Sequence, residues 1–171
     1  MIQELSILIP VYNGNAFPAV KRLSALCERI VMDSPSPFKY EIIVADDGSE
    51  QKEAIEANKA INQLYNCQYI IKEQNSGSAA TRNFLASQSH YEWLLFIDCD
   101  MEIPGMDCIM RYLPCDQKDV TNGGIKVGAS HETLQHNLRY LYEKRAEPAH
   151  TIDKRRAAGF QEFRSANFLI L

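Results

Sequence analysis

Trp93-Leu94-Leu95-Phe96-Ile97-Asp98-Cys99-Asp100 is the stretch that decides the fold class, because an apolar run leads directly into two acids. An apolar run of this length is typical of a strand that is buried on both faces. Residues 5–11, 40–45 and 67–72 form similar runs, and apolar residues at helical spacing lie between them. This alternation predicts an α/β fold with a mainly parallel sheet that is flanked by helices.

The helices and the remaining strands are predicted from their end signals and spacing. A helix is expected to begin at Pro18, where the missing N–H costs nothing, and Ser49 is expected to cap the next helix. Further helices are predicted at 79–89 and 106–113. Another amphipathic helix is indicated by Leu134, Leu138, Leu141 and Tyr142.

We expect a sheet of five strands, the fifth at 120–124, in which the strands 40–45 and 93–97 are neighbours. Residues 163–171 are interpreted as one more strand. The length of 171 residues suits a single domain, and 46% hydrophobic with 23% charged residues is ordinary for a globular chain. The sequence therefore predicts one domain over residues 1–171.

The net charge indicates which binding partners the chain can have, and the cysteine content indicates its cellular compartment. A formal net charge of −4 argues against nucleic-acid binding, which needs basic patches. Five cysteines without a CxxC pair indicate free thiols and a reducing, cytoplasmic compartment. No signal-peptide pattern precedes Leu5, and no run is long enough to span a bilayer. The basic run Lys154-Arg155-Arg156 fits either a solvated segment or a peripheral membrane contact.

Three polar clusters directly follow predicted strands: Tyr12-Asn13, Asp46-Asp47 and Asp98-Cys99-Asp100. Parallel strands end at the same edge of a sheet, and ligands bind beyond that edge near a topological switch point. The clusters therefore predict one ligand site.

Asp98 and Asp100 are candidates for binding a divalent cation. Two carboxylates held close together repel each other unless a cation lies near them. A hard cation bound by one or two carboxylates, with phosphate oxygens as further ligands, suits Mg²⁺ or Mn²⁺. A solvated acidic turn is the alternative.

The other polar residues also allow two interpretations. An acid of the Asp46-Asp47 pair can accept a hydrogen bond from a base or ribose, or the pair can serve a tight turn. Tyr12 can stack on a nucleobase or cover the end of its strand. Arg82, in a predicted helix that begins after Gly77, can reach a phosphate or lie exposed.

Together these motifs resemble glycosyltransferase family 2, whose members have the Rossmann-like GT-A fold. Residues 6–13 are similar to the family's opening strand, 41–49 to its second strand and acidic turn, and 96–100 to its metal-binding DxD motif. A further segment is matched by Asn75, Ser76, Gly77, Ala80, Arg82 and Asn83. The resemblance covers 5–124 well and is thinner beyond.

The resemblance implies a role for each matched position. The residues that would bind the nucleotide sugar are Pro10, Val11, Tyr12, Asn13, Asp46, Asp47, Gly77, Arg82 and Asp98. Within this set, Pro10 and Tyr12 would line the base pocket, and Asp47 is favoured for contact with the base. Asp98 would face the ribose or the metal, and Asp100 would bind Mn²⁺ or Mg²⁺ directly.

The family further implies an inverting transfer of sugar from a UDP- or GDP-sugar to an acceptor glycan or lipid-linked sugar. Cell-surface polysaccharide synthesis, at the inner face of the membrane, is the implied setting. Residues 1–125 would form the nucleotide-sugar-binding half, and 126–171 would begin the acceptor-side half.

The chain departs from the family at the general base. That Asp or Glu lies beyond the strand that 163–170 resembles, whereas this chain ends at Leu171, and neither Asp153 nor Glu162 matches it. We therefore expect an incomplete C-terminal part, with binding of nucleotide sugar and metal but slow or absent transfer. The alternative is a non-catalytic nucleotide-sugar-binding module.

Two other enzyme classes fit less well. A haloacid-dehalogenase-like phosphatase also has an Asp pair after a strand, but its motif requires Thr or Val at the position of Glu102. A nucleotidyltransferase would need a basic, glycine-rich loop after the first strand, and residues 12–16 contain no basic residue.

Overall fold

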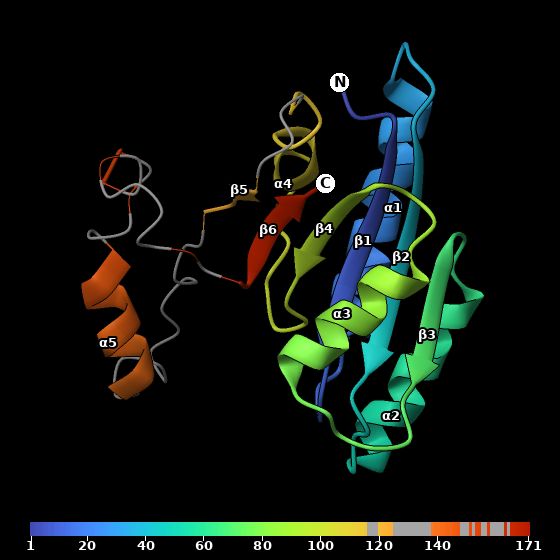
Figure 1. Cartoon of the computed structure of the whole chain (residues 1–171), viewed down its shortest axis with the longest axis vertical. Helices are drawn as coiled ribbons and strands as arrows, with labels where there is room; N and C mark the ends of the chain where they lie inside the picture. The colour runs from blue at the N-terminus through green and yellow to red at the C-terminus, as the bar shows by residue number, and fades with distance from the viewer. Residues whose placement is uncertain are drawn as a thin grey trace.

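The computed structural model describes residues 1–115, 120–124, 138–147, 151, 153–154, 157, 163 and 165–171. Within them, six strands form one sheet in the order β3-β2-β1-β4-β6-β5 (Figure 1). The strands are β1 (Glu4–Val11), β2 (Lys39–Asp46), β3 (Cys67–Ile71), β4 (Trp93–Ile97), β5 (Thr121–Asn122) and β6 (Asn167–Ile170). The helices are α1 (Phe17–Asp33), α2 (Lys52–Lys59), the 3-10 helix η1 (Ala60–Gln63), α3 (Ser78–Gln88), α4 (Asp107–Met110) and α5 (Leu138–Ala146).

Strand β1 is the centre of the sheet. It pairs in parallel with β2, from Glu4 opposite Lys39 to Val11 opposite Asp46, and in parallel with β4 on its other side. β3 continues the parallel part beside β2, whereas β6 is antiparallel to β4 and β5 is antiparallel to β6. The carboxyl ends of β1 to β4 therefore lie at one edge, where all the predicted clusters begin.

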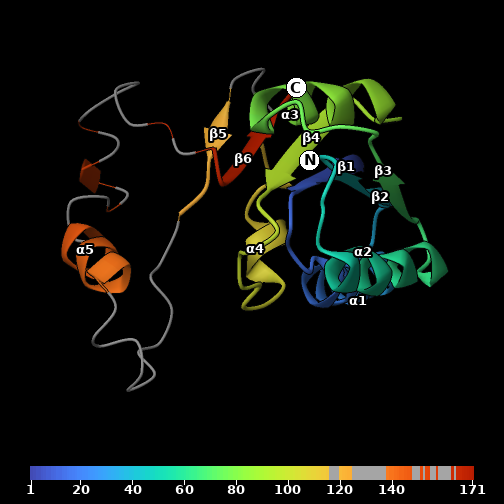
Figure 2. The same cartoon turned by 90° about the horizontal axis from the view of Figure 1, so that it is seen from below.

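Helices cover both faces of this sheet, with α3 on one face and α1 and α2 on the other (Figure 2). On the α1 side, Val20, Leu23 and Cys27 are fully buried, at the spacing that places them on one stripe of the helix. On the other side, Leu85 of α3 packs in a cluster with Leu8 of β1. Because both faces are covered, β1 is apolar along nearly its whole length, as a parallel strand requires.

The predicted neighbourhood of the strands 40–45 and 93–97 is wrong, because β1 lies between β2 and β4. The chain adds β2 and β3 on one side of β1 and then crosses to place β4 on the other. This reversal puts the topological switch point between β1 and β4, next to the loops after Val11 and Ile97. The sheet has six strands, one more than the five that we predicted for it. The additional strand is β6, which we had interpreted as a separate strand at the end of the chain.

Most other element predictions are confirmed, with one error at a helix start. The predicted strand 93–97 coincides with β4, and the other predicted strands and helices overlap observed ones within the described residues. Ser49 does not cap α2, which begins at Lys52 after Gln51. Ser49 Oγ instead accepts a hydrogen bond from the Asn13 N–H at 2.7 Å. The prediction of five free cysteines is confirmed.

Helix α5 stands apart from the sheet in both views (Figures 1 and 2). Leu138 is 83% exposed, and Leu141 and Tyr142 are also exposed, so the expected apolar face is not buried against the described body. Leu134 of the same predicted helix lies outside the described residues. In the described part of the chain, no helix combines the length and the apolar character that crossing a membrane requires.

Candidate functional site

Asp46 and Asp47 are consecutive, yet their carboxylates have different surroundings. Asp46 ends β2 and is fully buried. One of its oxygens accepts a hydrogen bond from the Tyr69 hydroxyl at 2.5 Å, and the other accepts one from the Ser49 N–H at 2.7 Å. Burial and this contact with Asp46 raise the pKa of Tyr69 well above its usual value. The Asp46 carboxylate thus holds the turn after β2 from inside the fold.

The Asp47 carboxylate holds the loop between β3 and α3. Its Oδ1 accepts hydrogen bonds from Lys72 Nζ at 2.6 Å and from the backbone N–H and hydroxyl of Ser76, each at 3.0 Å. Its Oδ2 accepts the Gly77 N–H at 2.9 Å. Gly77 has φ of 88°, a conformation that glycine adopts without cost, and α3 begins with the next residue. One buried carboxylate therefore fixes the whole connection from β3 to α3.

The charge of Asp47 is stabilised by these contacts. Burial alone would raise the pKa of Asp47, but the hydrogen bonds from Lys72, Ser76 and Thr81 outweigh burial and hold the pKa well below its usual value. The carboxylate is therefore ionised at neutral pH and can only accept hydrogen bonds.

Gly48 lets the loop after β2 approach the loop after β3. Its φ is 71°, and a Cβ at this position would lie 2.7 Å from the backbone nitrogen of Asn75 and 2.7 Å from the carbonyl carbon of Gln74. Any side chain here would force two backbone segments apart. Gly48 is thus required by a tertiary contact as well as by its backbone conformation.

A hollow of about 590 Å³ lies between these two loops. It is lined by Tyr12, Gly48, Ser49, Glu50, Ile71, Lys72, Glu73, Gln74 and Asn75. Tyr12 is 48% exposed and gives the hollow an aromatic side chain. Of the four predicted residues from Pro10 to Asn13, Tyr12 alone is among those that line the hollow within the described chain.

The three other predicted residues, Pro10, Val11 and Asn13, make structural contacts at the carboxyl end of β1. Val11 is buried, and its carbonyl accepts the Asp47 N–H at 2.8 Å. Pro10 is half-buried and lies opposite Ala45 in the sheet. Asn13 has φ of 51°, and its side-chain oxygen accepts the backbone N–H groups of residues 50 and 51 at 2.8 and 3.1 Å. Asn13 therefore holds the turn that leads into α2 from a distant part of the sequence.

Arg82 and Asp98 join α3 to the end of β4. Arg82 Nη2 donates to Asp98 Oδ1 at 2.5 Å and more weakly to the Ser165 carbonyl at 3.4 Å. Arg82 Nε is buried and has no partner among the described atoms. Burial raises the pKa of Asp98 above its usual value despite the opposing effect of Arg82. Arg82 and Asp98, which are 16 residues apart, are thus brought together as an ion pair.

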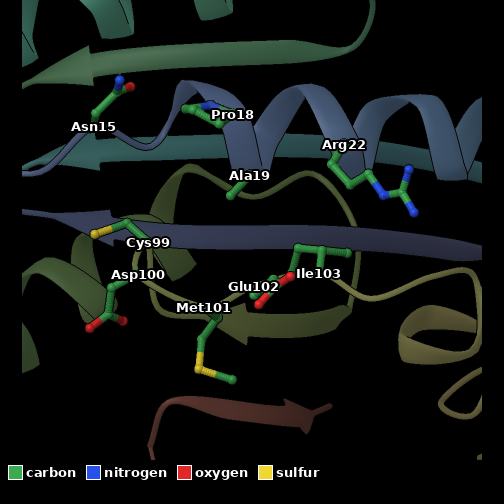
Figure 3. Close-up of a pocket in the computed structure, with 9 residues that line it drawn as sticks. All are labelled: Asn15, Pro18, Ala19, Arg22, Cys99, Asp100, Met101, Glu102 and Ile103. Carbon is green, nitrogen blue, oxygen red and sulfur yellow. The ribbon is translucent and has the colours of Figure 1, made fainter. Parts of the chain in front are cut away.

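Asp100 faces a second hollow, of about 300 Å³, on the α1 side of the same edge (Figure 3). Its lining comprises Asn15, Pro18, Ala19, Arg22, Cys99, Asp100, Met101, Glu102 and Ile103. Asp100 is exposed, and its charge helps to raise the pKa of Asp98. The described side chains contain no group of three or more His, Cys, Asp or Glu that could hold a metal.

The residues around Asp98 and Asp100 could supply only some of the ligands that a divalent cation needs. Asp100 offers carboxylate oxygens, which hard cations prefer, and it pairs with no basic side chain in the described part of the chain. Asp98 is already paired with Arg82. Mg²⁺ and Mn²⁺ are commonly bound by one or two carboxylates together with phosphate oxygens and water, so a diphosphate would complete the set.

Sequence reasoning missed Lys72, which pairs with the favoured acid Asp47. Lys72 follows β3 directly, so its place after a parallel strand was a usable signal. Its contact with Asp47, 25 residues away, depends on the pairing of β2 with β3. Of the two acids considered and rejected as the general base, Glu162 lies outside the described residues and Asp153 is exposed.

The geometry defines a class of protein: a mainly parallel α/β sheet with its polar groups at the switch point between β1 and β4, where such sheets bind ligands. The sequence model of glycosyl transferase family 2 matches residues 6–161, and the chain belongs to that family.

Relatives agree with this assignment over part of their length. An uncharacterized glycosyltransferase of Haemophilus influenzae is 34% identical over 106 residues, which are 62% of this chain and 30% of the relative. A chondroitin synthase of Escherichia coli is 36% identical over 102 residues, which are 59% of this chain and 14% of the relative. The chain thus spans less than a third of either relative.

A solved structure shows the fold. A mannosyltransferase from Pyrobaculum calidifontis, in complex with GDP-mannose and Mn²⁺, aligns with a TM-score of 0.56 at 14% identity. The alignment covers 97% of this chain and 44% of the mannosyltransferase. The predicted GT-A fold is therefore confirmed.

Proposed function

We propose that this chain forms the donor site of a glycosyltransferase, which binds a nucleoside-diphosphate sugar together with Mn²⁺ or Mg²⁺. The observation that carries the proposal is the convergence of Tyr12, Asp47, Arg82 and Asp98 on one edge of the sheet, with Asp100 following directly. The mannosyltransferase that shares the fold is described as bound to GDP-mannose and Mn²⁺, which supports this choice of ligand.

The base of the nucleotide would occupy the hollow beside Tyr12. The exposed ring can stack on a base, a contact worth about 1–3 kcal/mol. Asp47 precedes the lining residue Gly48 in the chain, and its Oδ2 accepts the Gly77 N–H. In this proposal the ionised Asp47 carboxylate would accept an N–H of the base.

The ribose and diphosphate would lie toward Asp98 and Asp100. Glu50 and Glu73 are negatively charged and line the hollow beside Tyr12, so they disfavour a phosphate group there. Asp98, held by Arg82, would accept a ribose hydroxyl, and Asp100 would hold the cation. Arg82 also places a positive charge and an unsatisfied Nε near this end. These residues would orient the donor so that its diphosphate faces the cation.

The chemistry is a substitution at the anomeric carbon of the sugar, with the nucleoside diphosphate as the leaving group. A bound divalent cation would supply Lewis-acid stabilisation of that group. This chain's contribution is to fix the nucleotide at Asp47 and Asp98. Deprotonation of the acceptor hydroxyl requires a general base, which we do not assign to any described residue.

The acceptor and the cellular role are proposed from the named relatives. A chondroitin synthase and a hyaluronan synthase of Pasteurella multocida are among them, the latter 28% identical over 98 residues. We infer an acceptor hydroxyl on a growing glycan or lipid-linked sugar in cell-surface polysaccharide synthesis. Peripheral membrane contact through the exposed Lys154 belongs to the same proposal.

Calorimetric titration of the chain with UDP and GDP, with and without Mn²⁺, tests the proposal. We expect binding of at least one nucleotide that strengthens with Mn²⁺, and Tyr12→Ala should weaken it by about 1–3 kcal/mol. Tyr65→Ala removes another exposed tyrosine, away from the hollow, and is the matched control. Absence of any Mn²⁺-dependent nucleotide binding would sink the proposal. Product formation from a UDP- or GDP-sugar would separate an enzyme from a binding module.

A further inference from the structure

Three phenylalanine rings lie in a row from the inside of the sheet to its surface. Phe96 of β4 stacks on Phe168 of β6 with ring centroids 4.8 Å apart, and Phe163 meets Phe168 at 5.0 Å with its ring tilted by 66°. Phe96 and Phe168 are buried, whereas Phe163 is 54% exposed. A single exposed apolar side chain is common on protein surfaces and carries no function by itself. What distinguishes Phe163 is its position.

Phe163 lies at the same edge of the sheet as the acids of the proposed donor site. Because β6 is antiparallel to β4, the residues before β6 lie beside the residues after β4. The Asp98 N–H donates to the Ala166 carbonyl at 2.9 Å, and Arg82 Nη2 donates to the Ser165 carbonyl at 3.4 Å. Phe163 precedes Ser165 by two residues, so its ring is close to the ion pair of Arg82 with Asp98.

The ring of Phe163 is also on the same face of the sheet as Arg82. Phe168, against which Phe163 packs, belongs to the buried cluster that includes Leu85 of α3. Arg82 precedes Leu85 by three residues in α3, so the two side chains lie on one side of that helix. Phe163 and Arg82 therefore both border the end of β4 from the α3 side.

The strand order indicates the direction in which a bound nucleotide sugar would extend. The hollow proposed for the base lies between the loops after β2 and β3, and the acids proposed for the ribose and the cation follow β4. In the order β3-β2-β1-β4-β6-β5, the next strand beyond β4 is β6 (Figure 1). A sugar at the far end of the diphosphate would therefore reach the start of β6, which Phe163 precedes.

A phenyl ring and a pyranose ring have complementary surfaces. The axial C–H groups of a hexopyranose form an apolar face with a slight positive charge, and the face of an aromatic ring is negative. The equatorial hydroxyl groups point sideways and stay free for hydrogen bonds. Because Phe163 already packs against Phe168, little freedom of its side chain would be lost when a sugar binds.

We propose that Phe163 binds the transferred sugar of the donor, by stacking its exposed ring against the C–H face of a hexopyranose. The inference rests on the proposed donor site and adds a residue for the sugar, to which none of the residues proposed above was assigned. Because the ring would touch the sugar and not the nucleotide, it should affect only the part of the affinity that the sugar contributes.

Calorimetry in Mn²⁺ compares UDP with UDP-glucose and GDP with GDP-mannose, and the ratio of affinities within each pair isolates the sugar. Phe163→Leu removes the aromatic face but keeps an apolar side chain against Phe168. In this variant we expect the affinity of the nucleotide sugar relative to its nucleotide to fall about three- to tenfold. Phe163→Trp should keep the ratio. Tyr65→Leu changes an exposed aromatic residue just before β3, at the opposite edge of the sheet, and should also keep it.

Proton NMR of the same nucleotide sugars reports the stacking directly. The measurement uses Mg²⁺, because Mn²⁺ is paramagnetic and broadens the signals. We expect the ring current of Phe163 to shift C–H signals of the sugar upfield in the presence of the unmodified chain, and Phe163→Leu to abolish the shift. A merely structural role of Phe163 would produce no such shift.

Two results would overturn the role of Phe163 and leave the donor site standing. One is an unchanged affinity ratio in Phe163→Leu, and the other is the absence of an upfield shift of the sugar signals with the unmodified chain. Failure of the unmodified chain to bind any of the four ligands would overturn both proposals. If Phe163→Leu does not fold, as judged by circular dichroism, the sugar signals with the unmodified chain decide.

Discussion

The two ends of the proposed donor site are built differently. At the base end, the Asp47 side chain is 6% exposed and receives four hydrogen bonds from the loop between β3 and α3. At the metal end, Asp100 is exposed and no basic side chain of the described chain pairs with it. Asp98 lies between these extremes, half-buried and bonded to Arg82.

The comparison indicates that the surroundings of Asp47 are already ordered without a ligand, whereas those of Asp100 are not. A buried carboxylate with all its partners present has a single orientation, and binding a base there costs little reorganisation. In the proposed site, the exposed Asp100, which repels its neighbour Asp98, would be held in place by a bound cation. We therefore expect the base end to contribute to the stability of the fold, and the metal end to contribute to affinity alone.

Gly48→Ala should produce the largest effect and would test whether the base end is preformed. A Cβ would meet backbone atoms of Gln74 and Asn75, and φ of 71° is strained for alanine. We expect a loss of about 3–5 kcal/mol in the free energy of unfolding, measured with urea. Gly105→Ala is the control, since a Cβ there would meet nothing within 4 Å. Equal losses in the two variants would contradict the close contact of the loops.

Asp47→Asn should produce the next largest effect, about 2–4 kcal/mol at neutral pH, because Lys72 loses its ionic partner. The depressed pKa of Asp47 means that folding favours its ionised form. Its contribution is complete above the unfolded pKa of about 4 and is lost as the pH falls further. Urea unfolding between pH 2 and 7 should therefore show a shallower acid loss in Asp47→Asn than in the unmodified chain. Asp33→Asn, at an exposed pair, should keep the original slope.

Asp100→Asn should have the smallest effect on stability, within about 0.5 kcal/mol, because the side chain is exposed. The same change should weaken the Mn²⁺-dependent part of nucleotide binding at least about tenfold. Calorimetry with and without Mn²⁺ measures this part. Asp107→Asn removes an exposed acid of α4 and should change neither quantity. A Mn²⁺ effect that survives in Asp100→Asn would refute the assignment of the metal end.

The sequence by itself determined the class of fold and the edge that carries the site. The apolar runs now seen as β1, β2 and β4 were recognisable because a strand covered on both faces must be apolar throughout. The acids after β2 and β4 were recognisable because they directly follow such runs. Both signals are local, so one sequence was enough to read them.

Only the tertiary structure decided the order of the strands and the structural role of each polar residue. The place of β1 between β2 and β4 depends on a crossover that no local pattern records. Asp46 and Asp47 are alike in sequence, but one turns toward Tyr69 and the other toward Lys72. Asn13 proved to hold the turn that precedes α2. Hydrogen bonds between segments that are 23 to 37 residues apart set these roles, and such contacts exist only once the sheet has formed.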